Sequence, residues 1–324
     1  MNDLRFAFRQ LAKAPGFTAV AILTLAVGIG ASTALFSVVN SVLLRPPGYP
    51  DPDRIVVIRA TQLPRMADAN VSPPDYLDWQ RESLSFSQLA ATYTSGINLT
   101  GAGDPQEITR TRATANYFAV FGVQPALGRA FNAEEDVPGR NRVVVLSHGC
   151  WQRQLGGRTD ALGSTVTLGH EPHTVIGIMP PGFHPAGDGE LWTPMAFSDA
   201  ERADYARGAR GYSVVGRLAA GVSLEQARAE LVALTRQLEL KYPDFNRGWS
   251  VSVTRWHDYA VRSVRLLLWV LLGAVACVQL VACTNLANPV WIPLQTNTLT
   301  NGSFYFSDPQ WTNYRSRFYQ LTMP

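Results

Sequence analysis

Two uncharged apolar stretches dominate the pattern of hydrophobic and polar positions along the chain. The first, from Gly16 to Leu44, contains 29 residues without a charged side chain. A helix rises about 1.5 Å per residue, so about 20 apolar residues cross the core of a bilayer. The stretch is about twice as long as the apolar core of a signal peptide, and no A-x-A-like cleavage site follows it. It therefore predicts an uncleaved transmembrane helix over residues 16–44.

The second apolar stretch runs for 18 residues from Leu266 to Cys283, and Gln279 is its one strongly polar side chain. This length predicts a second transmembrane helix, which we place over residues 266–288. A buried helix in the core of a soluble domain is the alternative, because such a helix can be equally apolar.

The first 15 residues combine an apolar and a basic periodicity. Apolar side chains recur at i, i+4 and i+7, and cations recur every four residues on a neighbouring face. The two sets are Leu4, Phe8 and Leu11, and Arg5, Arg9 and Lys13. The pattern predicts an amphipathic helix over residues 1–15 at a membrane surface, although an ordinary solvated basic segment is the alternative. The excess of cations before the first apolar stretch places the N-terminus in the cytoplasm.

Between the two apolar stretches, residues 45–265 mix short strand and helix patterns. Alternating or continuous apolar runs predict strands, whereas a 3.6-residue period predicts helices. The expected strands cover residues 55–59, 97–100, 106–113, 143–146, 165–168, 173–179, 212–218 and 251–254, and the expected helices begin at 73 and cover 116–121, 150–155 and 223–241. Such short and interspersed elements predict an α+β domain of two lobes.

The helix over residues 223–241 has the clearest signal. Ser223 and Gln226 form the pattern of a capping box, and an apolar stripe follows at helical spacing. In the helix that begins at residue 73, the side chains expected to face a core are Tyr76, Trp79 and Leu84.

Composition narrows the class of protein. Charged residues make up 16% of the 324-residue chain, below the roughly 25% of soluble domains, because the two apolar stretches contain none. The net charge of +3 and the lack of a basic run interleaved with aromatic residues argue against nucleic-acid binding. Two of the three cysteines, Cys277 and Cys283, lie in the second apolar stretch, so a disulfide framework with Cys150 is not expected.

The sequence offers little catalytic chemistry. No Walker A motif occurs, so the chain does not supply a P-loop ATPase of its own. His170 and His173 are three residues apart with a proline between them, which does not match the i, i+4 zinc pattern HExxH. Ser147 and His148 are neighbours but do not form G-x-S-x-G. A periplasmic hydrolase built on His148, His170 and His173 is the weaker hypothesis.

Two further groups are expected to be structural. The acidic run Glu134, Glu135 and Asp136 predicts a solvated loop, because it lacks the ligand spacing of a calcium site. Cys150 is expected to be a small buried apolar residue. We therefore assign no catalytic, metal-binding or cofactor-binding residue and expect that the protein is not an enzyme.

Several stretches, in their order along the chain, resemble permeases of the MacB/FtsX-like ABC transporter family, in particular their duplicated orphan-permease branch and their MacB-like periplasmic core domain. The stretches are NDLRFAFRQLAKAPGFTAVAILTLAVGIGASTALFSVVNSVLLRP (2–46), SPPDYLDWQ (72–80), ANYFAVFGVQPALGRAFNAEED (115–136), VVVLSHGCWQRQLGG (143–157), VIGIMPPGF (175–183), LWTPM (191–195), VVGRLAAGVSLEQARAEL (214–231) and LLLWVLLGAVACVQLVACTNLAN (266–288). Each stretch is weak evidence alone, but the ordered set is specific.

The resemblance implies a permease subunit of a mechanotransmission or efflux system in the bacterial inner membrane. Residues 45–265 would be periplasmic, and a separate cytoplasmic ABC ATPase would bind a permease homodimer or a pair with a partner permease chain. The cytoplasmic gate helix would correspond to Leu4–Ala14, and the stalk to Ser41–Arg45 and His257–Arg265. A membrane-anchored periplasmic binding or scaffold module without transport activity is the alternative, and either function allows a periplasmic partner.

The motifs of the core domain are expected to be structural. Their aromatic side chains would fill a core, and their glycines would shape turns. These residues are Trp79, Phe118, Trp151, Phe183 and Trp192, and Gly122, Gly128 and Gly182.

Residues 289–324 depart from the resemblance. In place of the basic segment and the further spans of related permeases, the chain has aromatic residues and an Asn301-Gly302 hairpin signal. We therefore expect a short, unrelated β-prone tail joined after a truncated permease, with a fusion or frameshift near residues 286–290.

Overall fold

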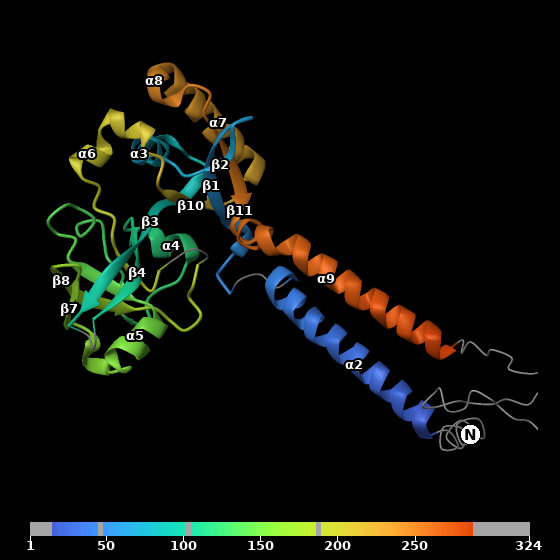
Figure 1. Cartoon of the computed structure of the whole chain (residues 1–324). Helices are drawn as coiled ribbons and strands as arrows, with labels where there is room; N and C mark the ends of the chain where they lie inside the picture. The colour runs from blue at the N-terminus through green and yellow to red at the C-terminus, as the bar shows by residue number, and fades with distance from the viewer. Residues whose placement is uncertain (1–14, 45–47, 102–104, 186–188, 288–324) are drawn as a thin grey trace, which may run out of the picture. The chain divides into compact units, whose positions relative to one another are not determined.

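The computed structural model describes residues 15–44, 48–101, 105–185 and 189–287 (Figure 1). The amphipathic helix expected over residues 1–15 and the β-prone tail expected over residues 289–324 lie outside the described residues, apart from Pro15. The chain divides into two compact units. One unit is Val39–Leu268, and the other consists of Met1–Val38 and Trp269–Pro324.

The unit Val39–Leu268 is built on a mixed β-sheet. Among the described residues its strands are β1 (Ile55–Gln62), β2 (Met66–Ala69), β3 (Phe86–Thr100), β4 (Gln106–Ala113), β5 (Leu127–Gly128), β6 (Val143–Leu146), β7 (Thr165–Leu168), β8 (Glu171–Ile178), β9 (Leu191–Pro194), β10 (Ser213–Leu218) and β11 (Ser250–Arg255). Their order is β11-β1-β10-β3-β4-β9-β6-β8-β5, with β2 beside β1 and β7 beside β3 and β8. The pairs β4–β9 and β6–β8 are parallel, and the other pairs are antiparallel.

Helices and single turns cover this sheet. The described α-helices of the unit are α3 (Pro73–Glu82), α4 (Tyr117–Phe121), α5 (His148–Leu155), α6 (Asp199–Arg202), α7 (Leu224–Lys241) and α8 (Pro243–Asn246). The 3₁₀ turns are η2 (Pro52–Arg54), η3 (Thr159–Ala161) and η4 (Asp204–Gly208). The expected mixture of helices and strands is thus confirmed.

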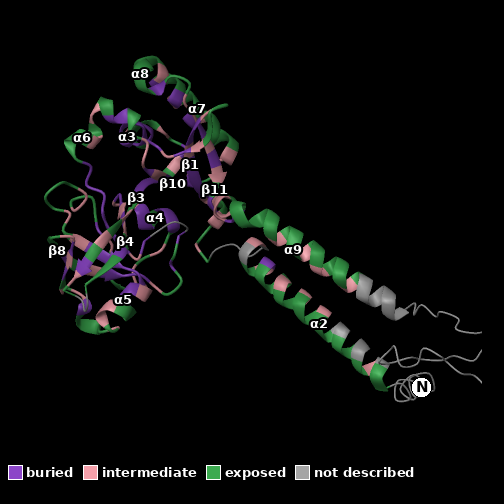
Figure 2. Cartoon of the chain, in the orientation of Figure 1, coloured by how far each residue is buried: buried purple, intermediate pink, exposed green. Residues whose placement is uncertain are grey.

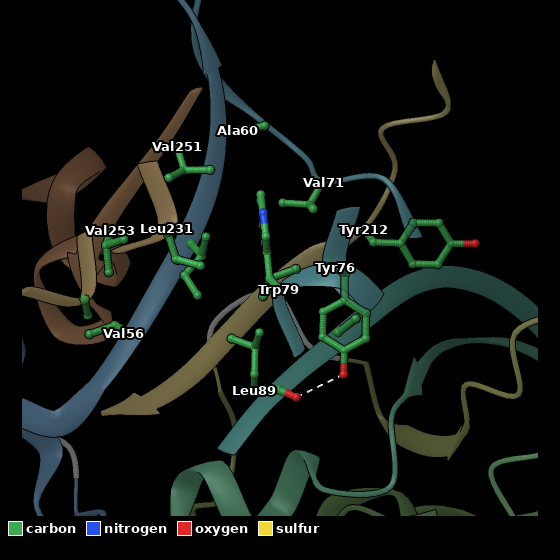
Figure 3. Close-up of a cluster of buried hydrophobic side chains, with 14 of the residues drawn as sticks. Val56, Ala60, Val71, Tyr76, Trp79, Leu89, Tyr212, Leu231, Val251 and Val253 are labelled. Atoms are coloured by element: carbon green, nitrogen blue, oxygen red, sulfur yellow. Dashed lines mark hydrogen bonds between the residues drawn. The ribbon is translucent and has the colours of Figure 1, made fainter. Parts of the chain in front are cut away.

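Side chains of β1 alternate between two hydrophobic clusters. Val56 and Ile58 pack into a cluster with α3 and α7, whereas Ile55 and Val57 pack into a second cluster with α4. This alternation follows from the two-residue period of a strand, and it requires apolar residues on both faces because both faces are covered. The first cluster is shown in Figure 3, where side chains from α3, α7 and several strands converge.

The 15-residue strand β3 connects all three hydrophobic clusters of the domain. Leu89 and Ala91 pack with α3 and α7, Ala90 packs with α4, and Leu99 packs in a third cluster with α5. The sequence predicts a strand only over residues 97–100, so most of β3 was missed. The missed part pairs with β10 through its backbone. Its sequence contains Ser87, Gln88 and other small or polar residues, so it lacks the strong apolar pattern that predicts a strand.

Helix caps follow the sequence closely. The capping box of Ser223 and Gln226 at the start of α7 is confirmed. The hydroxyl of Ser72 caps α3 by accepting a hydrogen bond from the amide of Asp75. The expectation that Leu84 faces a core is wrong, because α3 ends at Glu82 and the Leu84 side chain is 86% exposed.

Three turn glycines have positive φ angles, as their position in the motifs predicts. The φ angles are 67° at Gly122, 72° at Gly128 and 83° at Gly182. At Gly128 a Cβ atom would also lie 2.2 Å from the carbonyl oxygen of Ile176, so only glycine fits there.

Two long apolar helices complete the described chain. They are α2 (Pro15–Val39), followed by a π-helical turn η1 (Asn40–Leu44), and α9 (Trp256–Ala287). Most of their described side chains are exposed (Figure 2). Among the described residues, Trp256–Leu280 is the segment long and apolar enough to span a membrane, with a mean hydropathy of 2.0, and Ala26–Val39 is a shorter apolar segment. The expected pair of transmembrane helices therefore stays a prediction.

A side-chain hydrogen bond joins α2 and α9 within the unit made of Met1–Val38 and Trp269–Pro324. The hydroxyl of Ser32 donates a hydrogen bond of 2.6 Å to the side-chain carbonyl of Gln279. Gly28 lies one turn before Ser32, and a Cβ atom at Gly28 would be 3.7 Å from the Gln279 side chain. Small residues and a hydrogen-bonded amide are typical of contacts between helices in lipid.

A buried charge network holds α3, η4 and α8 together. Arg207 donates hydrogen bonds to Asp75 (2.8 Å) and Asp78 (2.6 Å), and Asn246 donates to Asp75 (2.9 Å). The Arg207 guanidinium also lies 3.7 Å from the ring centroid of Tyr242. The three charged side chains are more than 90% buried. Their hydrogen-bond and ion-pair partners must therefore compensate for the hydration that each charge loses on folding.

We expect Arg207→Gln to lower the free energy of unfolding by about 1–3 kcal/mol, because its charge-assisted hydrogen bonds to two buried carboxylates are lost. Asp75 keeps its ion pair with Arg210, and Asp78 keeps its ion pair with Arg81. The measurement is denaturant unfolding of the full chain in detergent micelles. Arg236→Gln is the matched control, since Arg236 is exposed on α7, and it should change the free energy by less than about 0.5 kcal/mol. Equal effects of the two variants would contradict the assigned role of the network.

Candidate functional site

The chain enters and leaves the domain at one aromatic cluster, which we call the entry junction and define as Tyr49, Phe121, Phe183 and Trp256. Tyr49 follows η1, and Trp256 is the first residue of α9. The ring centroid of Tyr49 lies 5.1 Å from that of Phe121, 6.0 Å from that of Phe183 and 5.6 Å from that of Trp256. All four residues belong to the unit Val39–Leu268.

Rings in the entry junction meet edge to face, the arrangement that aromatic quadrupoles favour. The Phe121 and Trp256 planes are 86° apart at a centroid distance of 6.0 Å. Such contacts contribute about 0.5–1.5 kcal/mol per pair beyond the burial of apolar area. The junction therefore connects segments separated by about 200 residues with directional contacts.

Hydrogen bonds reinforce the junction at its backbone. The His257 Nε2 atom lies 3.0 Å from the carbonyl oxygen of Leu43, so the tautomer with a proton on Nε2 donates this bond. Arg217 donates to the carbonyl oxygens of Val120 (2.8 Å) and Pro50 (2.9 Å). These bonds attach η1 to α9, and the segment after η1 to α4.

Charged side chains fix the first turns of α9 against β1 and β2. Asp68 on β2 forms ion pairs with Arg59 on β1 and with Arg262 on α9. The Arg262 guanidinium stacks 3.9 Å from the ring centroid of Tyr259. Burial alone would raise the pKa of Asp68, but the hydrogen bonds and charges of Arg59 and Arg262 outweigh it and lower the pKa below its usual range.

The residues of the hydrolase hypothesis make structural contacts. The Ser147 hydroxyl accepts a hydrogen bond from the Cys150 amide and so caps α5. The His148 ring lies 5.4 Å from the ring centroid of Trp151. Cys150 is fully buried, as expected, and burial raises the pKa of its thiol to about 12, which disfavours the nucleophilic thiolate.

The two histidines of the β7–β8 hairpin differ in environment. His170 is exposed in the turn, whereas His173 is 3% exposed and its Nδ1 atom lies 3.0 Å from the carbonyl oxygen of Glu171. Burial lowers the pKa of His173, so its ring stays neutral. Within the described ranges, no three or more His, Cys, Asp or Glu side chains gather as metal ligands.

The acidic run is only partly the solvated loop that the sequence predicts. Glu134 is exposed, and Glu135 forms a hydrogen-bonded ion pair with Arg129 at 2.7 Å. Asp136 is half-buried and accepts hydrogen bonds from the amides of Ala115 (2.9 Å) and Ala196 (2.6 Å). Asp136 therefore fixes two loops, and solvation is a wrong description for it.

Comparison with known proteins identifies the class of this domain. A family model described as the MacB-like periplasmic core domain matches residues 18–234. This match exceeds half of the chain, so the protein belongs to the family of MacB-like periplasmic core domain proteins found in ABC transporter permeases. The resemblance to MacB/FtsX-like permeases is confirmed, and membership implies a membrane protein with a periplasmic segment.

A curated relative supports the same family over a short region. The "Probable syringafactin export ATP-binding/permease protein SyfD" of Pseudomonas syringae pv. syringae is 36% identical over 70 residues, which are 22% of this chain and 11% of SyfD. The match thus spans about a tenth of the length of that relative.

Solved structures share the fold. A domain of a "putative Permease protein" from Porphyromonas gingivalis is 20% identical, with a TM-score of 0.51, and the match covers 64% of this chain and 92% of that domain. The periplasmic region of MacB from Actinobacillus actinomycetemcomitans is 16% identical with a TM-score of 0.48, and the match covers 69% and 98%. At 20% identity, the similarity to the Porphyromonas gingivalis domain shows a shared fold and nothing about function.

Sequence reasoning missed most of the entry junction. It assigned Phe183 to a core and placed Leu43 and His257 in expected stalk segments, but it gave no role to Tyr49, Phe121 or Trp256. An aromatic residue that directly follows the last strand and begins an apolar helix is a signal that points toward Trp256.

We expect Asp68→Asn to lower the free energy of unfolding by about 1–2 kcal/mol at neutral pH, because charge-assisted hydrogen bonds to Arg59 and Arg262 are lost. The pKa of Asp68 is depressed in the folded protein, so its contribution is present above about pH 4 and is lost as the pH falls through the folded pKa. The difference between the wild type and the variant should therefore narrow below about pH 4.

Thermal unfolding of the full chain in micelles between pH 3 and pH 7 measures this difference. Asp160→Asn is the control, because the ion pair of Asp160 with Arg158 is largely exposed. A gap that is constant across this pH range would contradict the ionised role of Asp68.

Proposed function

We propose that this protein is the permease subunit of an ABC-type mechanotransmission or efflux system in the bacterial inner membrane. In this proposal α2 and α9 lie in lipid, the N-terminus is cytoplasmic, residues 45–265 are periplasmic, and a separate cytoplasmic ABC ATPase drives the assembly. The permease works as a homodimer or beside a partner permease chain, and its domain acts on a periplasmic partner.

The entry junction is the single observation that carries this proposal. A force applied along either apolar helix reaches the domain at Tyr49 or at Trp256, and these rings contact each other and Phe121 on α4. Strand β11 ends at Arg255 and α9 begins at Trp256, so no loop separates the sheet from the helix. Packed interiors transmit displacement because they contain little free volume.

The first test is capture of the ATPase. The tagged full chain, extracted from bacterial membranes with its native neighbours, should recover a P-loop ATPase, and a Phe8→Cys variant should crosslink to it in a nucleotide-dependent manner. A chain that recovers no ATPase with or without nucleotide, but retains a periplasmic protein, would favour the membrane-anchored binding or scaffold module instead.

The second test addresses coupling through the junction. We expect Trp256→Leu to keep the crosslink at position 8 but to reduce by at least half the nucleotide-dependent change in hydrogen exchange at α4, because Leu packs without directional ring contacts. Tyr205→Leu is the matched control, since Tyr205 is 65% exposed, and should behave as the wild type. An unchanged exchange response in Trp256→Leu would overturn the role of the junction.

A further inference from the structure

A cavity of about 300 Å³ lies between α3, the β4–α4 connection, and the segment that leads into α6. Its lining combines apolar side chains, including those of Tyr76, Leu77 and Phe197, with the polar residues Gln80, Thr114, Asn116, Asp136 and Arg202. Tyr76 and Phe197 are buried, whereas Arg202 is exposed, so the cavity has a closed floor and opens toward solvent. Pockets of this size hold small molecules.

The floor of the cavity is rigid because its polar groups bind one another. The hydroxyl of Tyr76 donates to the carbonyl oxygen of Leu89 at 2.9 Å, as Figure 3 shows. Asn116 donates to the same carbonyl oxygen at 2.8 Å and accepts a bond from Thr114 at 3.0 Å. These bonds satisfy the backbone carbonyl of Leu89 on β3, at a position beyond the end of β4.

Asp136 contributes an acceptor with unused capacity. Each of its carboxylate oxygens accepts one backbone amide, from Ala115 and from Ala196, and each oxygen can accept one more hydrogen bond. Ala196 has a φ angle of 42°, which is unusual for a residue with a Cβ atom, so the bond holds a strained turn at this place. Burial raises the pKa of Asp136 above its usual range, although the hydrogen bonds from the Ala196 and Ala115 amides offset part of this effect.

Arg202 contributes the complementary charge. Its Nε atom donates to the carbonyl oxygen of Phe197 at 3.0 Å, and its guanidinium carbon lies 5.9 Å from the Phe197 ring centroid. Its two terminal nitrogens form no hydrogen bond to the described residues, although a guanidinium binds a carboxylate through two parallel bonds. The side chain is thus oriented by one bond and retains its capacity for an anion.

We propose that this cavity binds an α-amino acid unit with an apolar side chain, either as a free amino acid or as the C-terminal residue of a peptide. The ligand carboxylate pairs with Arg202, its ammonium or amide N–H donates to Asp136, and its side chain packs against the accessible lining residues Leu77 and Ala133. The volume accommodates one such residue. This inference is independent of the proposed transport role, because it uses the domain alone.

The test measures ligand binding to the full chain in lipid nanodiscs by saturation-transfer NMR, with L-leucine, N-acetyl-L-leucine and L-leucinamide as probes. We expect a Kd of about 0.1–1 mM for a ligand with a carboxylate and an N–H donor. L-Leucinamide, which lacks the carboxylate, should bind at least about tenfold more weakly. Preference for L-leucine indicates a free amino acid, and preference for N-acetyl-L-leucine indicates a peptide terminus.

Variants at the cavity complete the test. Arg202→Gln should weaken binding at least about tenfold, Arg202→Lys should weaken it less, and the exposed control Arg236→Gln should have no effect. Ala133→Trp places a large side chain on the exposed lining residue Ala133 and should abolish binding.

Three results would overturn the proposal. They are absence of binding by all three probes at about 10 mM, equal binding of L-leucinamide, and wild-type affinity in both Arg202→Gln and Ala133→Trp. Thermal unfolding of each variant shows whether a loss of binding comes from a lost fold, and the exposed Ala133 position makes such a loss unexpected.

Discussion

Edge-to-face packing of Tyr49 and Trp256 on Phe121 joins the two ends of the unit Val39–Leu268. Tyr49 follows the first apolar helix and Trp256 begins the second, so both connections converge on one side of the sheet, at α4. Arg217 and His257 add hydrogen bonds to backbone carbonyls at the same place. Neither connection can shift without disturbing the other, because the rings share one packed cluster.

The interior of the domain connects its helices and strands through three hydrophobic clusters. Strand β3 contributes Leu89, Ala90 and Leu99 to three separate hydrophobic clusters, so a single strand packs in all three. Buried polar groups add specificity to this apolar frame. Arg207 and its carboxylates fix α3 against η4, and Tyr76 with Asn116 closes an edge of β3. Tyr76 and Asn116, which belong to the sequence motifs, therefore have a structural role: both donate hydrogen bonds to the backbone of β3.

Local patterns in the sequence were sufficient for many elements. The capping box at Ser223, the β7–β8 hairpin and the turn at Gly122 depend on residues close in the chain, and the structure contains all three. Elements whose partners are distant were missed or misjudged. Leu84 has an apolar side chain but lies beyond the end of α3, and Asp136 belongs to an acidic run yet reaches amides at residues 115 and 196.

The sequence by itself determined the apolar character of the two long helices, the mixed domain between them and the family resemblance, because hydrophobic period, caps and ordered motifs are properties of neighbouring residues. Only the tertiary structure decided that Tyr49 meets Trp256, that Asp68 joins Arg262, and that Asp136 and Arg202 line one cavity. The physical reason is that such contacts depend on strand order and on the crossing of distant segments, which a one-dimensional pattern does not specify.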